Sequence, residues 1–273
     1  MDMGIANVWD KEELKQLWRS SFEDEERFVR FFFKELFPYA TPFVCIVGKQ
    51  IVCAAYLFPA QIMTDSGESI RVGYVYGVST YPQHRGFGYA TELLNFICVT
   101  MAQQEYSGIV LVPQSQSLFD FYKDRGFTSL CSIGKLQGNR SSEKISTEKM
   151  SMGNFVKRRK QLLFKLNTAM NFSQELSSLQ YKALDMDGCD FLDFTGGYAC
   201  VKKKETHLEI REILCGRDSC EQICGSLASL YDCDTYEAAT AEAGEMTPFA
   251  LIRWIREETP MRDKNVYINL IFN

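Results

Sequence analysis

Residues Val75-Tyr-Gly-Val-Ser-Thr-Tyr-Pro-Gln-His-Arg-Gly-Phe-Gly-Tyr-Ala-Thr-Glu-Leu-Leu94 decide the fold of this chain. They predict a short apolar strand, a turn that holds two glycines, and the start of an amphipathic helix. Glycine lets the main chain approach a ligand closely, and the first N–H groups of a helix lack intrahelical acceptors. The stretch therefore predicts a backbone site for an anion such as pyrophosphate, favoured by the positive end of the helix dipole.

The spacing of the two glycines, Gly86 and Gly88, argues against two other phosphate-binding loops. It differs from G-x-x-x-x-G-K-[ST], so a nucleoside-triphosphate loop is not supported. It also differs from G-x-G-x-x-G, and no βαβ unit with a spaced acidic residue follows, so a dinucleotide site is disfavoured. An ordinary turn before a helix is the remaining alternative for a motif of this length.

The neighbouring residues strengthen the interpretation of the loop. Residues Arg71 to Thr80 are rich in Val and Tyr and predict a strand. Apolar residues recur at helical spacing after the loop, at Ala90, Leu93, Leu94, Ile97, Cys98 and Met101. Strand, loop and helix thus follow one another in the order that an anion site needs.

A second motif lies downstream. Gly108 to Pro113 is a short apolar run that ends at a proline, which predicts a buried strand. Ser115 to Arg125 predicts a helix, which Gly126 would end ahead of Phe127.

Together these motifs resemble the GCN5-related N-acetyltransferases (GNAT superfamily). Gln83-His-Arg-Gly86-Phe-Gly88 fits Q/R-x-x-G-x-G/A, the acyl-CoA pyrophosphate loop of that family, and Tyr122-Lys-Asp-Arg-Gly126-Phe127 reproduces its Tyr-x-x-x-Gly-Phe pattern. The resemblance implies an α/β (α+β) fold with a mixed β-sheet flanked by helices. It also implies an enzyme that uses acetyl-CoA as acetyl donor, with an amine acceptor and no metal.

The resemblance assigns roles to individual residues. The strand backbone around Val78, Ser79 and Thr80 would hold the acyl oxygen and pantetheine. Tyr122 would be the general acid, because a phenol with a pKa near 10 stays protonated at neutral pH; a core tyrosine is the alternative. The residues that would hold the pyrophosphate are Gln83, His84, Arg85, Gly86, Phe87, Gly88, Tyr89, Ala90 and Thr91.

The general base is not identified by the sequence. Many relatives use a glutamate on the strand before the loop, but this strand carries Tyr74 and Tyr76, and phenols are seldom ionised at neutral pH. His84 is expected to face solvent. The terminal carboxylate of Asn273, which would be ionised at pH 7, is our candidate; a frayed tail and a water-mediated base are the alternatives.

Composition limits the remaining choices. The chain has 273 residues, of which 46% are hydrophobic and 24% charged, as in ordinary globular proteins of two domains. A net charge of −5 argues against a nucleic-acid partner. No apolar run is long enough for a membrane span and no signal peptide is apparent, so we expect a cytoplasmic protein whose ten cysteines are reduced.

The chain is expected to contain a GNAT domain with the acetyl-CoA site over residues 1–135, a linker over 136–153, and a smaller, degenerate GNAT-like α/β domain over 154–273. The second domain lacks its own glycine loop, as in two-domain acetyltransferases of the enhanced-intracellular-survival type. Helices are predicted at 11–36 with a break near Ser20-Ser21, at 154–171 and at 220–231. Strands are predicted at 43–47 and 51–57, joined in a tight hairpin, at 197–204 and 207–214, paired through Glu205-Thr206, and at 235–241. An apolar run at 249–255 precedes a closing strand at 266–272.

Three functional hypotheses follow. The first is an acetyl-CoA-dependent N-acetyltransferase acting on a primary amine of a small molecule or peptide. The second is a non-catalytic acyl-CoA-binding or scaffold protein, which would not need Tyr122. The third, nucleic-acid binding through the basic quartet Lys157 to Lys160, fits poorly with the acidic balance, and a solvated helix face explains that quartet better. The acceptor and the oligomeric state are not readable from the sequence.

Overall fold

The computed structural model describes residues 1–64, 67–166, 168–256, 265–270 and 272. They form two compact units, which are described separately below. Unit 1 contains Met1–Ile62, Ser69–Thr128 and the described part of Ala250–Asp263. Unit 2 contains Met63–Glu68, Ser129–Phe249 and Lys264–Asn273, again over the described residues.

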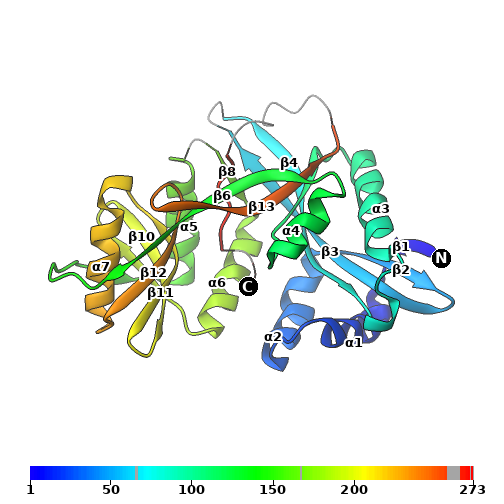
Figure 1. Cartoon of the computed structure of the whole chain (residues 1–273), viewed down its shortest axis with the longest axis horizontal. Helices are drawn as coiled ribbons and strands as arrows, with labels where there is room; N and C mark the ends of the chain where they lie inside the picture. The colour runs from blue at the N-terminus through cyan, green and yellow to red at the C-terminus, as the bar shows by residue number, and fades with distance from the viewer. Residues whose placement is uncertain (65–66, 167, 257–264, 271, 273) are drawn as a thin grey trace. The chain divides into compact units, whose positions relative to one another are not determined.

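Unit 1 is built on a mixed sheet (Figure 1). The strands β1, β2 and β3 are antiparallel neighbours, β4 and β5 are parallel, and the end of β13 is antiparallel to β5. These strands are β1 (Asp2–Ile5), β2 (Thr41–Val47), β3 (Gln50–Met63), β4 (Ser69–Thr80), β5 (Gly108–Leu111) and β13 (Glu245–Trp254). The predicted hairpin between β2 and β3 is confirmed, with Gly48 at a φ of +68° in its turn.

The alternation of side chains along β3 gives unit 1 two apolar layers. Cys53 and Leu57 belong to a core packed with α3 (Tyr89–Gln103). Tyr56 points the opposite way, and its ring lies 5.5 Å from that of Trp18 on α1 (Lys11–Ser21). The sheet therefore carries α3 on one face and the aromatic N-terminal helices on the other.

The N-terminal helical segment breaks close to the predicted position. α1 ends at Ser21, and α2 (Glu26–Phe31) follows and continues as a π-helical turn over Phe32–Leu36. α4 (Gln116–Lys123) begins after Ser115, whose hydroxyl accepts a hydrogen bond from the N–H of Leu118. Ser115 is thus an N-cap residue that satisfies one free donor of the helix.

In unit 2, the first part of β13 and six further strands are neighbours in the order β13-β6-β12-β11-β10-β9-β7. The predicted hairpin of β10 and β11 is confirmed, and the pair of β11 and β12 is parallel. These strands are β6 (Thr128–Asn139), β7 (Glu148–Lys149), β9 (Asp190–Phe194), β10 (Gly197–Lys204), β11 (His207–Leu214) and β12 (Thr235–Thr240). The short strand β8 (Ala169–Asn171) forms a bridge to Tyr267.

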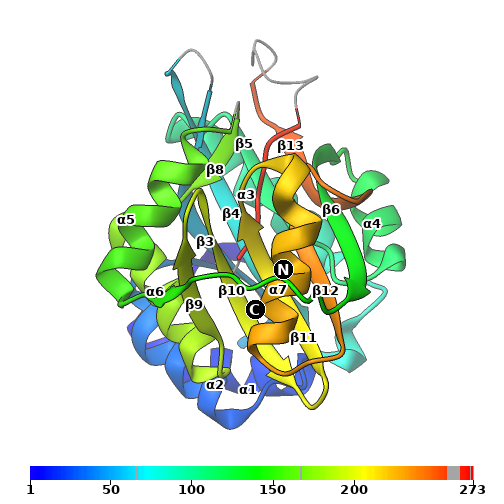
Figure 2. The same cartoon turned by 90° about the vertical axis from the view of Figure 1, so that its left-hand side faces the viewer.

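Alternation also divides unit 2 into two layers. Val201 belongs to the core beneath α7 (Cys220–Leu230), which lies across β10 to β12 in Figure 2. Tyr198 faces the other side, where its ring lies 5.8 Å from Phe155 of α5 (Met152–Leu163). α6 (Gln174–Met186) packs beside α5.

The structure corrects three predicted elements. The stretch predicted as a linker begins as the last residues of β6 and later contains β7, because β6 pairs with β12 through Asn139. The predicted helix over 154–171 ends at Leu163, and its last three residues form β8. Residues 266–270 and 272 form no strand beyond the bridge at Tyr267, although all but Asn269 are buried apolar residues. This apolar run is therefore buried in the core, but it does not form the ladder of hydrogen bonds that a β-strand makes with its neighbour.

Candidate active site

The loop between β4 and α3 has an open backbone. Gly86 and Gly88 have φ angles of +83° and +81°, and a Cβ added to either would meet no atom within 4 Å. Gly88 is the N-cap of α3 with no side-chain cap. These left-handed conformations are strained for other residues, so the glycines fix the shape of the loop and leave space beside it.

This loop presents a row of free donors. Among the described residues, no backbone or side-chain acceptor takes the N–H groups of Gly86 to Thr91. The next N–H, that of Glu92, donates to the carbonyl of Gly88. Six adjacent donors therefore converge at the positive end of a fifteen-residue helix, which suits an anion.

The side chains of the loop point in different directions. The Nε of Arg85 donates to the carbonyl oxygen of Thr80 at 3.1 Å, so this guanidinium turns back toward β4. Phe87 is 69% exposed and its ring stacks on that of Tyr89 with centroids 5.9 Å apart. Gln83 is exposed, and His84 is half-buried with its ring 6.2 Å from Tyr89. The backbone, rather than these side chains, makes the anion site.

A cation that the sequence did not single out lies beside the first turn of α3. The Nε of Arg125 donates to Thr91 Oγ1 at 2.7 Å, and its Nη1 donates to the carbonyl of Phe121 at 2.6 Å. No carboxylate in the described part of the chain pairs with it. Arg125 lies inside the Tyr-x-x-x-Gly-Phe pattern, three residues after Tyr122. This position within the pattern was the signal in the sequence that could have identified it as a site residue.

β4 separates from β5 ahead of the loop. The two strands pair only from Val72 to Tyr74, so β4 continues to Thr80 without β5 on that side. Gly77 has a φ of +62° within β4, and a Cβ there would lie 2.8 Å from Trp18. The edge of β4 at Val78, Ser79 and Thr80, which β5 does not pair with, therefore offers main-chain groups to an extended ligand.

Tyr122 lies at the same end of the sheet. It is 7% exposed and packs in the core that contains Cys53, whose Sγ accepts a hydrogen bond from Thr80 Oγ1 at 3.2 Å. The pKa of Tyr122 is raised to about 12, mainly because the phenol is buried and also because the thiol of Cys53 lies nearby. The positive charge of Arg125 offsets part of this rise. The phenol is therefore protonated throughout the neutral range.

The tyrosines on β4 are unsuited to act as bases. Burial raises the pKa of both Tyr74 and Tyr76 above the ordinary phenol value, so they stay protonated. A carboxylate that the sequence did not indicate faces Tyr76: Asp24, in the break between α1 and α2, contributes to the raised pKa of that phenol. Asp24 Oδ2 also accepts a hydrogen bond from Trp18 Nε1 at 2.9 Å.

Three further predictions concern residues or groups beyond this loop. The candidate base at Asn273 lies outside the described residues. Across the described ranges, no group of three or more His, Cys, Asp or Glu side chains is arranged to hold a metal ion. The helices of the described part include none that is long and apolar enough to cross a membrane.

Residues 6–130 match the family model described as Acetyltransferase (GNAT) domain. No curated protein sequence matches the chain. The resemblance predicted from the two motifs is thus confirmed for the part of the chain that carries them.

Solved structures share the fold over nearly the whole chain. A conserved protein of unknown function from Enterococcus faecalis, a probable N-acyltransferase, has a TM-score of 0.76 at 13% identity, covering 93% of this chain and 72% of its own. Eis1 from Mycobacterium abscessus has a TM-score of 0.71 at 10% identity, with coverages of 94% and 75%. A tandem GNAT protein from the clavulanic acid biosynthesis pathway has a TM-score of 0.56 at 10% identity, with coverages of 94% and 99%. The fold is that of GNAT proteins, including the GNAT-like second half.

Proposed function

We propose that this chain is an N-acetyltransferase that moves an acetyl group from acetyl-CoA to a primary amine of a small molecule or peptide. The GNAT domain over residues 6–130 supports acyl transfer as the reaction class. The observation that carries the proposal is the row of unpaired N–H groups from Gly86 to Thr91.

The residues at this loop fit the pyrophosphate of acetyl-CoA. The open space beside Gly86 and Gly88 admits phosphate oxygens close to the backbone. Arg125 adds a positive charge next to Thr91 without a carboxylate among the described residues to neutralise it. The free edge of β4 from Val78 to Thr80 would hold the pantetheine amides by main-chain hydrogen bonds.

Bound acetyl-CoA would supply an activated thioester. The chain's own contribution would be to align donor and acceptor, which accounts for much of the rate in two-substrate reactions. Tyr122 would act at the sulfur. Because its pKa is about 12, its hydroxyl holds its proton more tightly than a free thiol, whose pKa is about 8.5. Tyr122 is therefore better suited to donate a hydrogen bond to the departing sulfur than to transfer its proton fully.

On the acceptor side, Asp24 would attract a cationic amine. It lies between α1 and α2. Its carboxylate is fixed by Trp18 Nε1 and is exposed to solvent. We propose no acyl-CoA site in unit 2, and the domain boundaries, the cytoplasmic location and the role of Asn273 stay predictions.

The decisive experiment is calorimetric titration of acetyl-CoA into the wild type, Gly86→Trp and Gly48→Trp. Gly48 is the matched control, because it too has a positive φ of +68° and no atom within 4 Å of an added Cβ. We expect micromolar binding by the wild type and Gly48→Trp, and loss of at least about 100-fold in Gly86→Trp because side chain and strain both disrupt the donor row.

Two results would overturn parts of the proposal. Absence of acetyl-CoA binding by the wild type would remove the acyl-CoA site altogether. Binding without release of free CoA thiol across a panel of primary amines and peptides would favour the non-catalytic alternative.

In an active preparation, Asp24→Asn should raise the KM for cationic amines and leave the affinity for acetyl-CoA unchanged.

A further inference from the structure

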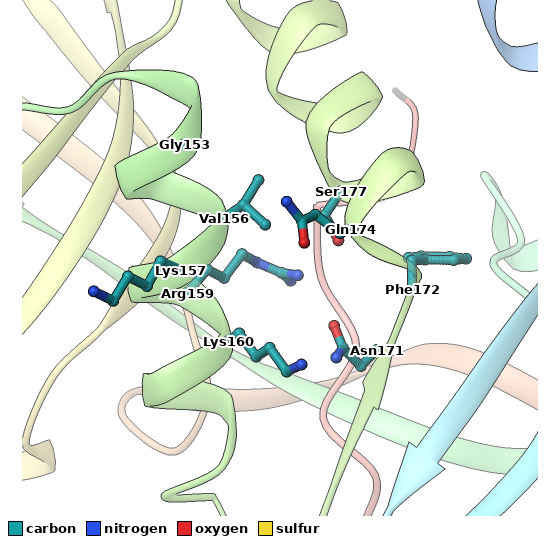
Figure 3. Close-up of a pocket in the computed structure, with 9 residues that line it drawn as sticks. All are labelled: Gly153, Val156, Lys157, Arg159, Lys160, Asn171, Phe172, Gln174 and Ser177. Carbon is teal, nitrogen blue, oxygen red and sulfur yellow. The ribbon is translucent and has the colours of Figure 1, made fainter.

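A hollow of about 400 Å³ lies in unit 2 between α5, β8 and the start of α6. Figure 3 shows the residues that line it, which come from both helices and from the segment that joins them. They are Gly153, Val156, Lys157, Arg159, Lys160, Asn171, Phe172, Gln174 and Ser177. The hollow is large enough for a small organic ligand. Its lining includes three basic side chains and no acidic one among the described residues.

Arg159 is buried at this hollow with one nitrogen unused. The side chain is 5% exposed, and its Nε and Nη2 donate to the two carboxylate oxygens of Glu212 at 2.8 and 3.0 Å. Nη2 also donates to the carbonyl of Asn269 at 3.0 Å. No acceptor within the described residues takes Nη1. Nη1 is not one of the fully buried side-chain atoms that lack a partner among the described residues, so it is open to solvent at the edge of the hollow and available as a donor.

Other donors surround the same space. Ser177 is 7% exposed, and its hydroxyl has no hydrogen-bond partner in the described part of the chain. Lys160 carries its amine toward Asn171 in Figure 3, and its Nζ lies 5.9 Å from the ring centroid of Phe164. No carboxylate in the described part of the chain pairs with this amine. Lys157, on the same helix, points its amine away from the space. The amine of Lys160, one guanidinium nitrogen of Arg159 and the hydroxyl of Ser177 thus lie at a common hollow and are available as donors.

The first turn of α6 adds little to this set. The hydroxyl of Ser173 already accepts the N–H of Leu176, and the carboxylate of Glu175 folds back onto its own N–H and Ser173, which lowers its pKa. The donors that remain available are therefore side chains on two helices. Such a set of donors suits an acceptor-rich group.

We propose that unit 2 carries an anion site of its own in this hollow, which binds a small phosphate-bearing molecule. A phosphate monoester carries close to two negative charges and three acceptor oxygens, which matches donors that arrive from Arg159, Lys160 and Ser177 separately. A carboxylate has two oxygens and one charge, so it would leave part of this set unused. The site is separate from the proposed acetyl-CoA site, and it gives the basic quartet a function other than nucleic-acid binding.

The test is calorimetric titration of glycerol 3-phosphate, with inorganic phosphate, succinate and glycerol as comparison ligands. The full chain is used in a Gly86→Trp background, so that the loop at Gly86 does not contribute a second anion site. We expect glycerol 3-phosphate to bind at one site per chain and about ten times tighter than succinate, because the phosphate carries close to two charges and three acceptor oxygens on one group, whereas each carboxylate of succinate carries one charge and two oxygens. Glycerol should not bind.

Lys160→Met and Lys157→Met remove the same charge from the same helix and differ in where the amine points. We expect Lys160→Met and Ser177→Ala to weaken binding about tenfold and about fivefold, and Lys157→Met less than about twofold. Thermal unfolding of each variant, with and without ligand, shows whether it is folded. Equal losses in the two lysine variants, or no binding of any anion at millimolar concentration, would overturn the proposal.

Discussion

The two units have the same order of elements at one point and differ in what the turn contains. In unit 1 β4 leads through the loop at Gly86 into α3; in unit 2 β11 leads through a 3-10 turn, Arg217–Ser219, into α7. Gly86 and Gly88 have φ angles of +83° and +81°, whereas Gly216 has an ordinary φ of −61°. The first turn leaves the N–H groups of six successive residues without an acceptor among the described residues, whereas in the second the N–H groups of Ser219 and Cys220 donate to the carbonyls of Gly216 and Arg217.

In unit 2, side chains occupy the corresponding positions. The N–H and the hydroxyl of Ser219 both donate to the carbonyl of Gly216, at 3.2 and 3.1 Å. Cys220, at the start of α7, is 2% exposed, and its thiol contacts those of Cys215 and Cys224. The comparison teaches that strand, turn and helix do not make an anion site by themselves. Left-handed glycines are needed to keep the donors open.

The basic side chains differ in the same way. In unit 1 Arg125 binds a hydroxyl and a carbonyl. In unit 2 Arg159 is bound by Glu212, which is completely buried. Unit 1 also has α4 with Tyr122 after β5, whereas residues 241–244 turn directly from β12 into β13. The following predictions test whether Arg125 in unit 1 binds a ligand and whether the ion pair of Arg159 with Glu212 stabilises unit 2.

The largest effect is expected from Arg159→Met. Removing the cation leaves Glu212 charged and buried, which should destabilise the chain by about 3–5 kcal/mol. Chemical denaturation measures this. Arg158→Met is the matched control, because its ion pair with Asp193 is partly exposed at 2.7 Å and is worth about 1 kcal/mol or less. Similar losses in the two variants would contradict the structural role of Arg159. The double variant Arg159→Met, Glu212→Leu should recover much of the stability.

Tyr122→Phe is expected to lower kcat about 100-fold and leave the Kd for acetyl-CoA unchanged, because the hydroxyl would act only as the sulfur departs. The release of CoA thiol measures kcat. The ratio of wild type to variant should stay constant from pH 7 to 10, since the pKa of the buried phenol is about 12. The folded pKa lies above the unfolded one, so any stability linked to this group is present below pH 10 and lost toward pH 12.

The control for this prediction is Tyr198→Phe in unit 2. Tyr198 is fully buried, and its hydroxyl has no hydrogen-bond partner among the described residues. It therefore tests the loss of a buried hydroxyl without the proposed chemistry. An equal fall in kcat in both variants would remove Tyr122 from the mechanism.

Arg125→Met should weaken acetyl-CoA about tenfold, because a charge-assisted hydrogen bond to phosphate is lost. The difference in affinity between the wild type and Arg125→Met should be smaller at high salt, because salt screens the attraction between Arg125 and the phosphate in the wild type. Calorimetry at two salt concentrations measures both effects. Lys123→Met removes an exposed charge from the end of α4, two residues before Arg125, and should change the affinity less than about twofold. Equal losses would show that only net charge matters.

The smallest effect is expected from alanine at the paired glycines. Gly88→Ala places a Cβ on a left-handed residue, which costs about 1–2 kcal/mol. Gly216→Ala keeps an ordinary φ and meets only Ser219 Oγ at 3.5 Å, so its stability should change by less than about 0.5 kcal/mol. Thermal unfolding and acetyl-CoA titration measure both. A neutral Gly88→Ala would show that the loop tolerates a side chain there.

Much of unit 1 was predictable because its signals are local. The glycine spacing predicted the loop, helical periodicity predicted α3, and Ser115 and Gly126 delimited α4 closely. Arg125 and Asp24 could not be assigned from the sequence, because their roles depend on where α4 and the break between α1 and α2 pack. The sequence prediction also omitted α6 and β9, whose patterns are weak without their neighbours.

The sequence by itself determined which residues form the anion loop, since left-handed backbone and helix starts depend on a few adjacent residues. Only the tertiary structure decided which strands pair. β6 pairs with β12 in unit 2, while the end of β13 pairs with β5 in unit 1, so no single cut in the chain separates the units. The tertiary structure also decided the conformation of residues 266–270. Their sequence predicted a strand, but buried polar contacts, such as the hydrogen bond from the Tyr267 hydroxyl to Glu212, hold them in place instead. Alternating apolar residues show that a segment is buried on one face. They do not show which strand it pairs with, because segments distant in the sequence compete for the same edge of the sheet.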